Sequence, residues 1–119
     1  MTSPLAPRPT RVAIVGAGFI AEFHLEILRS TPGVEVVAVC DADLARAQSA
    51  ARRHGVAAAV GTIAELEPLQ IDVAHVLVPP HLHVAVARDL LQRRIGVFVE
   101  KPLALASEEA RELGALARA

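Results

Sequence analysis

The chain has almost none of the residues that mark a disulfide-bonded, metal-binding or membrane-spanning protein. Its 119 residues include a single cysteine, Cys40, which excludes an internal disulfide, and no group of potential ligands has the spacing of a metal site. The longest run without a charged residue covers the 15 residues from 73 to 87 and contains two prolines. It falls short of the roughly 18 to 20 apolar residues that a membrane span requires. We therefore expect a cytoplasmic protein that binds no metal and contacts no membrane.

Aromatic residues and unbalanced charge are also scarce. Trp and Tyr are absent and Phe occurs three times, although 53% of the residues are hydrophobic. The core must therefore consist of Ala, Val, Leu and Ile, which is typical of helices packed on a buried parallel sheet. The 12 basic and 13 acidic residues give a net charge of -1, and the basic residues are scattered. This balance argues against nucleic acid as a partner.

The length fits one domain. Residues 1–10 contain three prolines and no apolar segment, so we expect a flexible tail there rather than a secretory signal. Residues 11–119 are expected to form the domain itself. A last helix, predicted from Ser107, has no stop signal before the final residue, so we expect a sheet truncated after its fifth βα unit.

From Arg11 onward, short β-branched runs alternate with longer amphipathic segments, as in successive βαβ units. The predicted strands are residues 12–15, 34–40, 56–60, 73–78 and 97–99, and the predicted helices are residues 19–29, 44–53, 62–68 and 83–94. Asp43 and Gly55 are expected to cap the second helix, and Thr62 with Glu65 has the form of a capping box. The pattern predicts an α/β fold, a doubly wound parallel sheet of Rossmann type with strand order 3-2-1-4-5.

Residues 16–21, which we call the Gly-rich turn, match the dinucleotide-binding fingerprint G-x-G-x-x-[G/A] between a predicted strand and a predicted helix. Gly16 would permit the tight turn, Gly18 the close approach of a pyrophosphate, and Ala21 the close packing of helix on strand. The amide groups at the helix start, at Phe19 and Ile20, would then bind the diphosphate. A strand-to-helix turn that is rich in glycine without binding a ligand is the alternative.

Asp41 strengthens the nucleotide interpretation. It ends the second predicted strand, 20 residues beyond Ala21, where a carboxylate can accept both ribose hydroxyl groups of an adenosine. The alternative is that Asp41 merely begins a loop. Because Ala42 follows it and no cation is adjacent, Asp41 should repel a 2′-phosphate, so we expect NAD rather than NADP. We expect Arg46 and Arg52 to be solvated charges on the following helix.

Three further segments resemble one family. Residues 18–24 end in a histidine, His24, one helical turn into the predicted first helix; residues 78–83 resemble a T-P-P-x-x-H segment; and residues 99–103 contain the tripeptide E-K-P. Together with the Gly-rich turn, they resemble the NAD(P)-binding N-terminal half of a Gfo/Idh/MocA-type oxidoreductase. The resemblance covers residues 11–119.

The resemblance implies roles for several residues. Lys101 would lie beside the nicotinamide and the substrate hydroxyl and would organise proton transfer, with Glu100 as its possible partner. The loop at Val78, Pro79 and Pro80 would contact the cofactor, although Val78 replaces the threonine of the family. His83 would either cap its helix or line the nicotinamide pocket, and both alternatives stay open. His24 is expected to pack the first helix against its neighbour, His75 to be a core residue, and His54 to interact with a helix dipole.

The resemblance also implies a second, mostly antiparallel domain beyond residue 119 that supplies a further acid or base and most of the substrate pocket. The substrate would be a sugar, a nucleotide-sugar or a cyclic polyol, and the full-length protein would be a homo-oligomer. A non-catalytic NAD-binding regulator of the same fold is the alternative, but the intact Glu100-Lys101-Pro102 segment favours an enzyme.

Overall fold

A computed structural model describes residues 8–99 together with Ala115 and Ala117. The strands are β1 (Thr10–Val15), β2 (Val34–Cys40), β3 (Ala58–Val60), β4 (Val73–Val76) and β5 (Gly96–Val99). The α-helices are α1 (Phe19–Arg29), α2 (Leu44–His54) and α3 (His83–Gln92), and the 3₁₀ helices are η1 (Ile63–Leu69) and η2 (Pro80–Leu82). The helix predicted from Ser107 lies outside the described residues except at Ala115 and Ala117. None of the described helices is long and apolar enough to cross a membrane.

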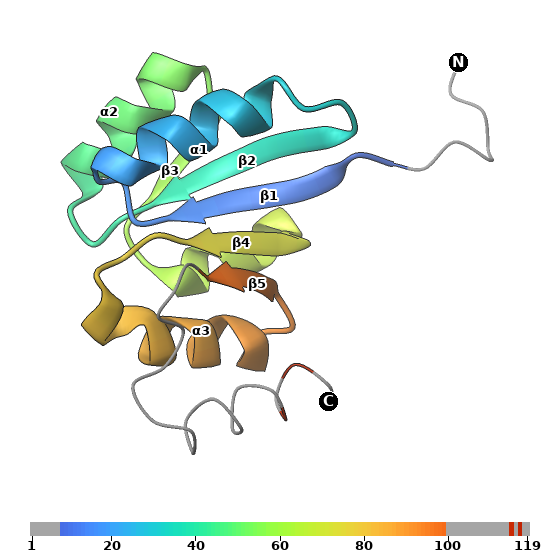
Figure 1. Ribbon diagram of the computed structural model, residues 1–119, viewed down its shortest axis with the longest axis vertical. Coiled ribbons are helices and arrows are strands. Elements are labelled where there is room, and N and C mark those ends of the chain that lie inside the picture. Colours follow the sequence, from blue (N-terminus) through green and yellow to red (C-terminus); the bar gives the residue numbers. More distant parts are fainter. Residues whose placement is uncertain (1–7, 100–114, 116, 118–119) are drawn as a thin grey trace.

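The strands form one sheet in the order β3-β2-β1-β4-β5, and every neighbouring pair is parallel. Helices α1 and α2 cover one face of this sheet, and η1 and α3 cover the other (Figure 1). The predicted doubly wound fold and strand order are confirmed. Because the chain leaves β1 and β4 in opposite directions across the sheet, the carboxyl ends of these two neighbours border a crevice.

The core is built from aliphatic side chains that alternate between the two faces of the sheet. On one face, Ile14 packs with Leu25 of α1 and Ala47 of α2, and all three are fully buried. On the other face, the fully buried Ala13 of β1 packs in a cluster with Leu66 of η1 and Leu90 of α3. Small side chains on the sheet let the helices approach closely, so the described core needs no aromatic ring.

Some predicted boundaries differ from the structure because local hydrogen bonding ends or delays an element. Thr10, which the sequence assigns to the tail, begins β1. β3 starts at Ala58 rather than at Val56, since the Val56 amide donates to the Ala51 carbonyl and completes the end of α2. β4 ends at Val76, two residues early, because the chain turns into η2 at the proline pair. α3 ends at Gln92, and Arg94, which the sequence places in that helix, has a positive φ of 63°.

Of the three predicted capping features, the structure confirms the two that belong to α2. Asp43 caps α2 through its side chain, and Gly55 ends that helix in the left-handed conformation, as predicted. The capping box at Thr62 is wrong: its hydroxyl donates to the Glu65 carboxylate at 2.9 Å and does not cap the backbone. The segment forms a 3₁₀ helix that contains Pro68, whose ring would clash with the carbonyl of Ala64 in an α-helix.

The histidine contacts also refine the predictions. His24 packs α1 against the sheet, since its Nδ1 lies 3.2 Å from Nδ1 of His75 on β4. His75 is only partly buried, and its ring stacks on Phe98 of β5 at a centroid distance of 4.8 Å. His54 bonds to Glu22 of α1 and so links α2 to α1.

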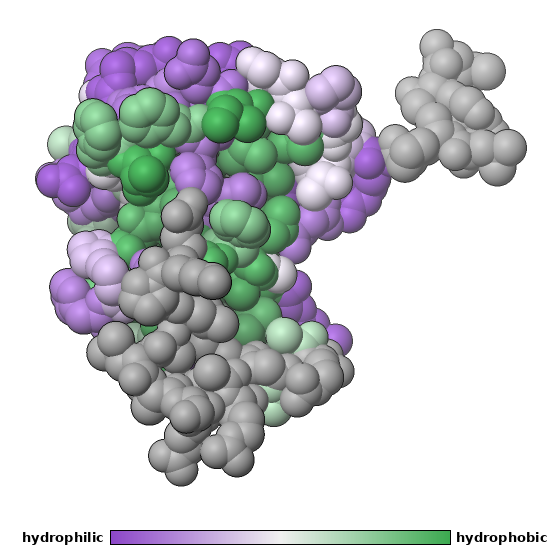
Figure 2. Space-filling model, in the orientation of Figure 1, coloured by the Kyte–Doolittle hydropathy of each residue, from purple (hydrophilic) through white to green (hydrophobic). Residues whose placement is uncertain are grey.

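Part of the surface is apolar. Phe19, Phe23 and Ile27 of α1 and Phe98 of β5 are all about half exposed or more. Figure 2 shows apolar side chains along the middle of the visible face, with hydrophilic residues over the outer helix layer at its top. Large apolar side chains are therefore exposed on both α1 and β5.

Candidate functional site

The Gly-rich turn connects β1 to α1 at the carboxyl edge of the sheet, and its first glycine is required by the fold itself. Gly16 has a φ of 104°, which side chains other than hydrogen rarely tolerate. A Cβ atom at Gly16 would lie 2.8 Å from both the carbonyl carbon of Leu77 and the amide nitrogen of Val78. Gly16 therefore lets the turn lie directly on the backbone that follows β4.

The second glycine of the turn has no such role within the chain. Gly18 is the N-cap of α1 with φ -83° and ψ -163°, an extended conformation that any residue adopts. A Cβ atom at Gly18 would meet no described atom within 4 Å. Neither backbone strain nor packing thus explains a glycine at this position, whereas close approach of a ligand would.

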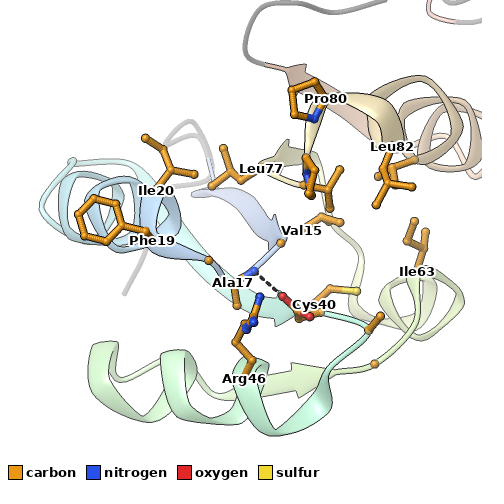
Figure 3. A pocket seen from close by; sticks show the side chains of 18 residues that line it. Val15, Ala17, Phe19, Ile20, Cys40, Arg46, Ile63, Leu77, Pro80 and Leu82 are labelled. Atoms are coloured by element: carbon orange, nitrogen blue, oxygen red, sulfur yellow. Dashed lines mark hydrogen bonds between the residues drawn. The ribbon is translucent and has the colours of Figure 1, made fainter.

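The Gly-rich turn forms one wall of a cavity of about 650 Å³, a volume typical of small-molecule sites (Figure 3). Of the residues that the sequence assigns to a cofactor site, those on the cavity wall are Gly16, Gly18, Phe19, Ile20, Asp41, Val78, Pro79 and Pro80. They come from the carboxyl ends of β1 and β2, the start of α1 and the loop after β4. The structure therefore brings these segments together at the crevice that the strand order creates.

Ala21 and His83 do not line this cavity. Ala21 is 1% exposed and packs between α1 and the sheet, which is the contact expected of a small third residue in the fingerprint. His83 is 4% exposed, and its Nε2 donates to the Val78 carbonyl oxygen at 2.8 Å. The predicted capping role of His83 is wrong, because η2 precedes it and Leu82 is the N-cap of α3. His83 instead holds the loop that follows β4. A contact with the nicotinamide stays a prediction.

Glu100 and Lys101 lie outside the described residues. The last described residue before them is Val99, the end of β5, and β5 pairs in parallel with β4. The position of Lys101 beside a nicotinamide therefore stays a prediction.

Asp41 lines the cavity and at the same time bonds to the protein backbone. Its Oδ2 accepts a hydrogen bond from the Ala17 amide at 2.8 Å, and its Oδ1 accepts one from the Asp43 amide at 2.8 Å. Each carboxylate oxygen can accept a second hydrogen bond. Asp41 can therefore still bind the hydroxyl groups of a ribose while it holds the Gly-rich turn.

Arg46, which the sequence predicts to be only a solvated charge on its helix, lies on the cavity wall. Its side chain is exposed, lines the cavity and extends from α2 toward Ala17 (Figure 3). The expectation that no cation lies near the ribose position is therefore wrong. A signal was present, because the predicted N-cap Asp43 puts Arg46 in the first turn of α2, at the same edge of the sheet as Asp41.

The other wall residues that were not predicted are apolar and lie at or after the carboxyl ends of strands; they include Cys40, Ile63, Leu82 and Val86. Cys40 is 3% exposed, and burial, together with the charges of Asp41 and Glu65, raises the pKa of its thiol to about 11. The thiol therefore stays protonated at neutral pH and is not a nucleophile. This part of the wall offers an apolar surface on which a flat ring could pack.

The chain matches known proteins over almost its full length. A family model described as "Oxidoreductase family, NAD-binding Rossmann fold" (GFO_IDH_MocA) matches residues 10–119. D-glucoside 3-dehydrogenase from Escherichia coli is 36% identical over 99% of this chain and 34% of that protein. The crystal structure of GenD2 from gentamicin A biosynthesis, in complex with NAD, has a TM-score of 0.86 and 31% identity, and the match covers 99% of this chain and 34% of that one.

A second solved structure was obtained with the other nicotinamide cofactor. KijD10, a 3-ketoreductase from Actinomadura kijaniata in complex with NADP and TDP-benzene, has a TM-score of 0.87 and 32% identity, and the match covers 93% of this chain and 34% of that one. The present chain thus spans about a third of the length of the relatives it matches.

Proposed function

This chain belongs to the GFO_IDH_MocA oxidoreductase family, whose NAD-binding Rossmann domain it forms, and we propose that it serves an enzyme that transfers a hydride between NAD(P) and a sugar, nucleotide-sugar or cyclic polyol. The observation that carries the cofactor part of this proposal is Gly18. It faces the cavity, and neither the chain's conformation nor its packing requires a glycine there. The substrate class is supported by relatives whose names include a D-glucoside dehydrogenase and a 3-ketoreductase solved with a TDP derivative.

The described residues fit a dinucleotide. No described side chain caps the first turn of α1, whose first residues, Phe19 and Ile20, line the cavity, so their amide groups could bind a diphosphate. Asp41 would accept the hydroxyl groups of the adenosine ribose, and the apolar wall at Ile63 and Val86 would contact the adenine. The loop at Pro79 and Pro80 also lines the cavity and would border the nicotinamide half.

When bound, the cofactor supplies the two-electron acceptor or donor, and the chain's residues position the reactants. We propose that Lys101 holds the substrate hydroxyl and moves its proton, and that Glu100 keeps the ammonium group oriented. The retained Glu100-Lys101-Pro102 segment supports chemistry over a purely regulatory role.

We also propose that the protein prefers NAD to NADP. The Asp41 carboxylate on the cavity wall would repel a 2′-phosphate, whereas it can accept hydrogen bonds from a 2′-hydroxyl. Arg46 on the same wall would weaken this preference without reversing it.

The substitution Gly18→Ala tests the cofactor site. The added methyl group points into space that no described residue occupies, so we expect an unchanged unfolding midpoint. NAD affinity, measured by calorimetry, should fall at least about tenfold, because the methyl group would occupy the position of the diphosphate. Gly33→Ala is the matched control: Gly33 does not line the cavity and has a φ of 79°, so this variant should lose stability and keep its NAD affinity. Wild-type NAD affinity in Gly18→Ala would refute the proposed site.

Lys101→Met tests the chemistry in the full-length enzyme. Removal of one positioned proton donor should lower turnover of a sugar or polyol by about 10²- to 10⁴-fold and leave cofactor affinity nearly unchanged. Near-normal turnover in this variant would remove Lys101 from the mechanism.

A further inference from the structure

Asp41 connects two parts of the cavity that are 24 residues apart in the chain. Its Oδ2 accepts a hydrogen bond from the amide of Ala17, the residue between the two glycines of the Gly-rich turn (Figure 3). We propose that Asp41 is a positioning residue for the phosphate-binding turn, in addition to any contact it makes with the ribose. This inference rests on the proposed NAD site.

Asp41 is itself fixed in place, so it can hold the turn. Its backbone amide donates to the Val60 carbonyl of β3 at 3.1 Å, and its second carboxylate oxygen accepts from the Asp43 amide at 2.8 Å. Next to it, the Gly16 amide donates to the Cys40 carbonyl at 2.8 Å. The end of β2 therefore holds two consecutive amides of the turn, one through its backbone and one through the Asp41 side chain.

This arrangement determines which amide groups can meet a phosphate. The Ala17 amide is bonded to a carboxylate, a charge-assisted bond that is stronger than one between neutral groups. The anion must therefore be bound by amides from Gly18 onward, at the start of α1. Because the turn is held before a ligand arrives, less conformational freedom is lost on binding, which favours affinity.

The ribose role and the positioning role predict different results for a ligand without ribose hydroxyl groups. We would measure the dissociation constants of NAD and of its analogue with a 2′,3′-dideoxyadenosine half, for the purified protein and for Asp41→Ala. If Asp41 acts only through the ribose, the substitution weakens NAD and leaves the analogue unaffected. If it also positions the turn, the analogue too should bind about tenfold more weakly. Unchanged affinity for the analogue would overturn the proposal.

Asp41→Asn adds a rescue test. Its single carbonyl oxygen can still accept from the Ala17 amide, so it should recover part of the analogue affinity that Asp41→Ala loses. If neither NAD nor the analogue binds to the unmodified protein, the proposed function fails, and amide exchange then decides the positioning role separately.

The hydrogen-exchange rate of the Ala17 amide in the unmodified, ligand-free protein tests the positioning role of Asp41 directly. This test remains available if Asp41→Ala does not fold. The proposal predicts strong protection of this amide, comparable to that of Ile14 within β1. Exchange at the rate of an unprotected peptide amide would overturn it. Asp43→Ala is the matched control: it removes a neighbouring carboxylate that bonds to the Arg46 amide and not to the turn, so Ala17 should stay protected.

Discussion

The amino and carboxyl ends of the strands both carry charged residues, but they use them differently. At the amino edge, Asp72 accepts two hydrogen bonds from the Arg8 guanidinium, at 2.9 and 2.7 Å, and a third from the Arg11 amide at 2.8 Å. The Arg11 side chain donates to the carbonyl oxygens of Leu69 and Gln70. A hollow of about 540 Å³ exists here as well, yet the charges that line it are paired with one another.

At the carboxyl edge, the polar groups face the cavity. Among the described residues, Arg46 forms no ion pair, Gly18 leaves space in front of the backbone, and Asp41 keeps unused lone pairs on both oxygens. The comparison indicates that charges which satisfy one another stabilise the fold, whereas groups directed at an open volume are available to a ligand. Cavity volume alone does not distinguish the two edges.

Gly16→Ala should have the largest effect, because it should destabilise the fold at the carboxyl edge of the sheet. The substitution forces an unfavourable positive φ and places a Cβ atom 2.8 Å from backbone atoms of Leu77 and Val78. We expect a loss of about 3 kcal/mol or more in the free energy of unfolding, from strain and overpacking combined. Urea unfolding followed by circular dichroism measures this loss. An unfolding midpoint equal to that of Gly18→Ala would contradict the inference that the fold requires Gly16 and not Gly18.

Arg46→Ala tests whether the charge at the carboxyl edge is available to a ligand. Loss of the guanidinium should weaken NADP binding by about tenfold, since a favourable charge near the 2′-phosphate is removed, and should change NAD binding little. The unfolding midpoint should stay the same because the side chain is exposed. Arg52→Ala is the control, since it removes the same charge from the same helix but outside the cavity. Equal losses of NADP affinity in both variants would mean that only net charge matters.

Asp72→Asn tests the amino edge and should have the smallest effect. The hydrogen bond from Arg8, followed by that from the Arg11 amide, lowers the pKa of Asp72 from its ordinary value of 3.8. Because the pKa of this carboxyl group is depressed on folding, its contribution to stability is present above about pH 4 and is lost as the pH falls through the folded-state value. At pH 7 we expect a Tm a few degrees lower than in the wild type, and the difference should shrink toward pH 2.

NAD affinity is the control measurement for Asp72→Asn, because this variant should change stability alone. Asp72 lies at the opposite edge of the sheet from the cavity, so Asp72→Asn should bind NAD as tightly as the wild type at pH 7. A pH-independent difference in Tm, or a clear loss of NAD affinity, would show that the amino edge is not the separate, purely stabilising region described above.

Much of the fold could be predicted because its signals are local. The alternation of β-branched runs with amphipathic segments yielded the strand order, and the cap residues Asp43 and Gly55 lie where they were expected. The predictions were wrong in two situations. At Val56, a residue expected in a strand forms a hydrogen bond that ends the preceding helix. At Pro68, a single residue disfavours an α-helix. Such competition between neighbouring elements is not visible in a residue pattern.

The sequence by itself determined the α/β fold, the Gly-rich turn and the presence of a carboxylate after β2, because each depends on residue types within a few positions of one another. Only the tertiary structure decided that Gly16 is needed by the loop after β4 and Gly18 by nothing in the described chain, that His83 turns inward, and that Arg46 reaches the cavity. The physical reason is that these outcomes depend on atoms from distant segments. The sheet and its crossovers bring those segments within a few ångströms of each other, and their spacing along the chain does not encode that contact.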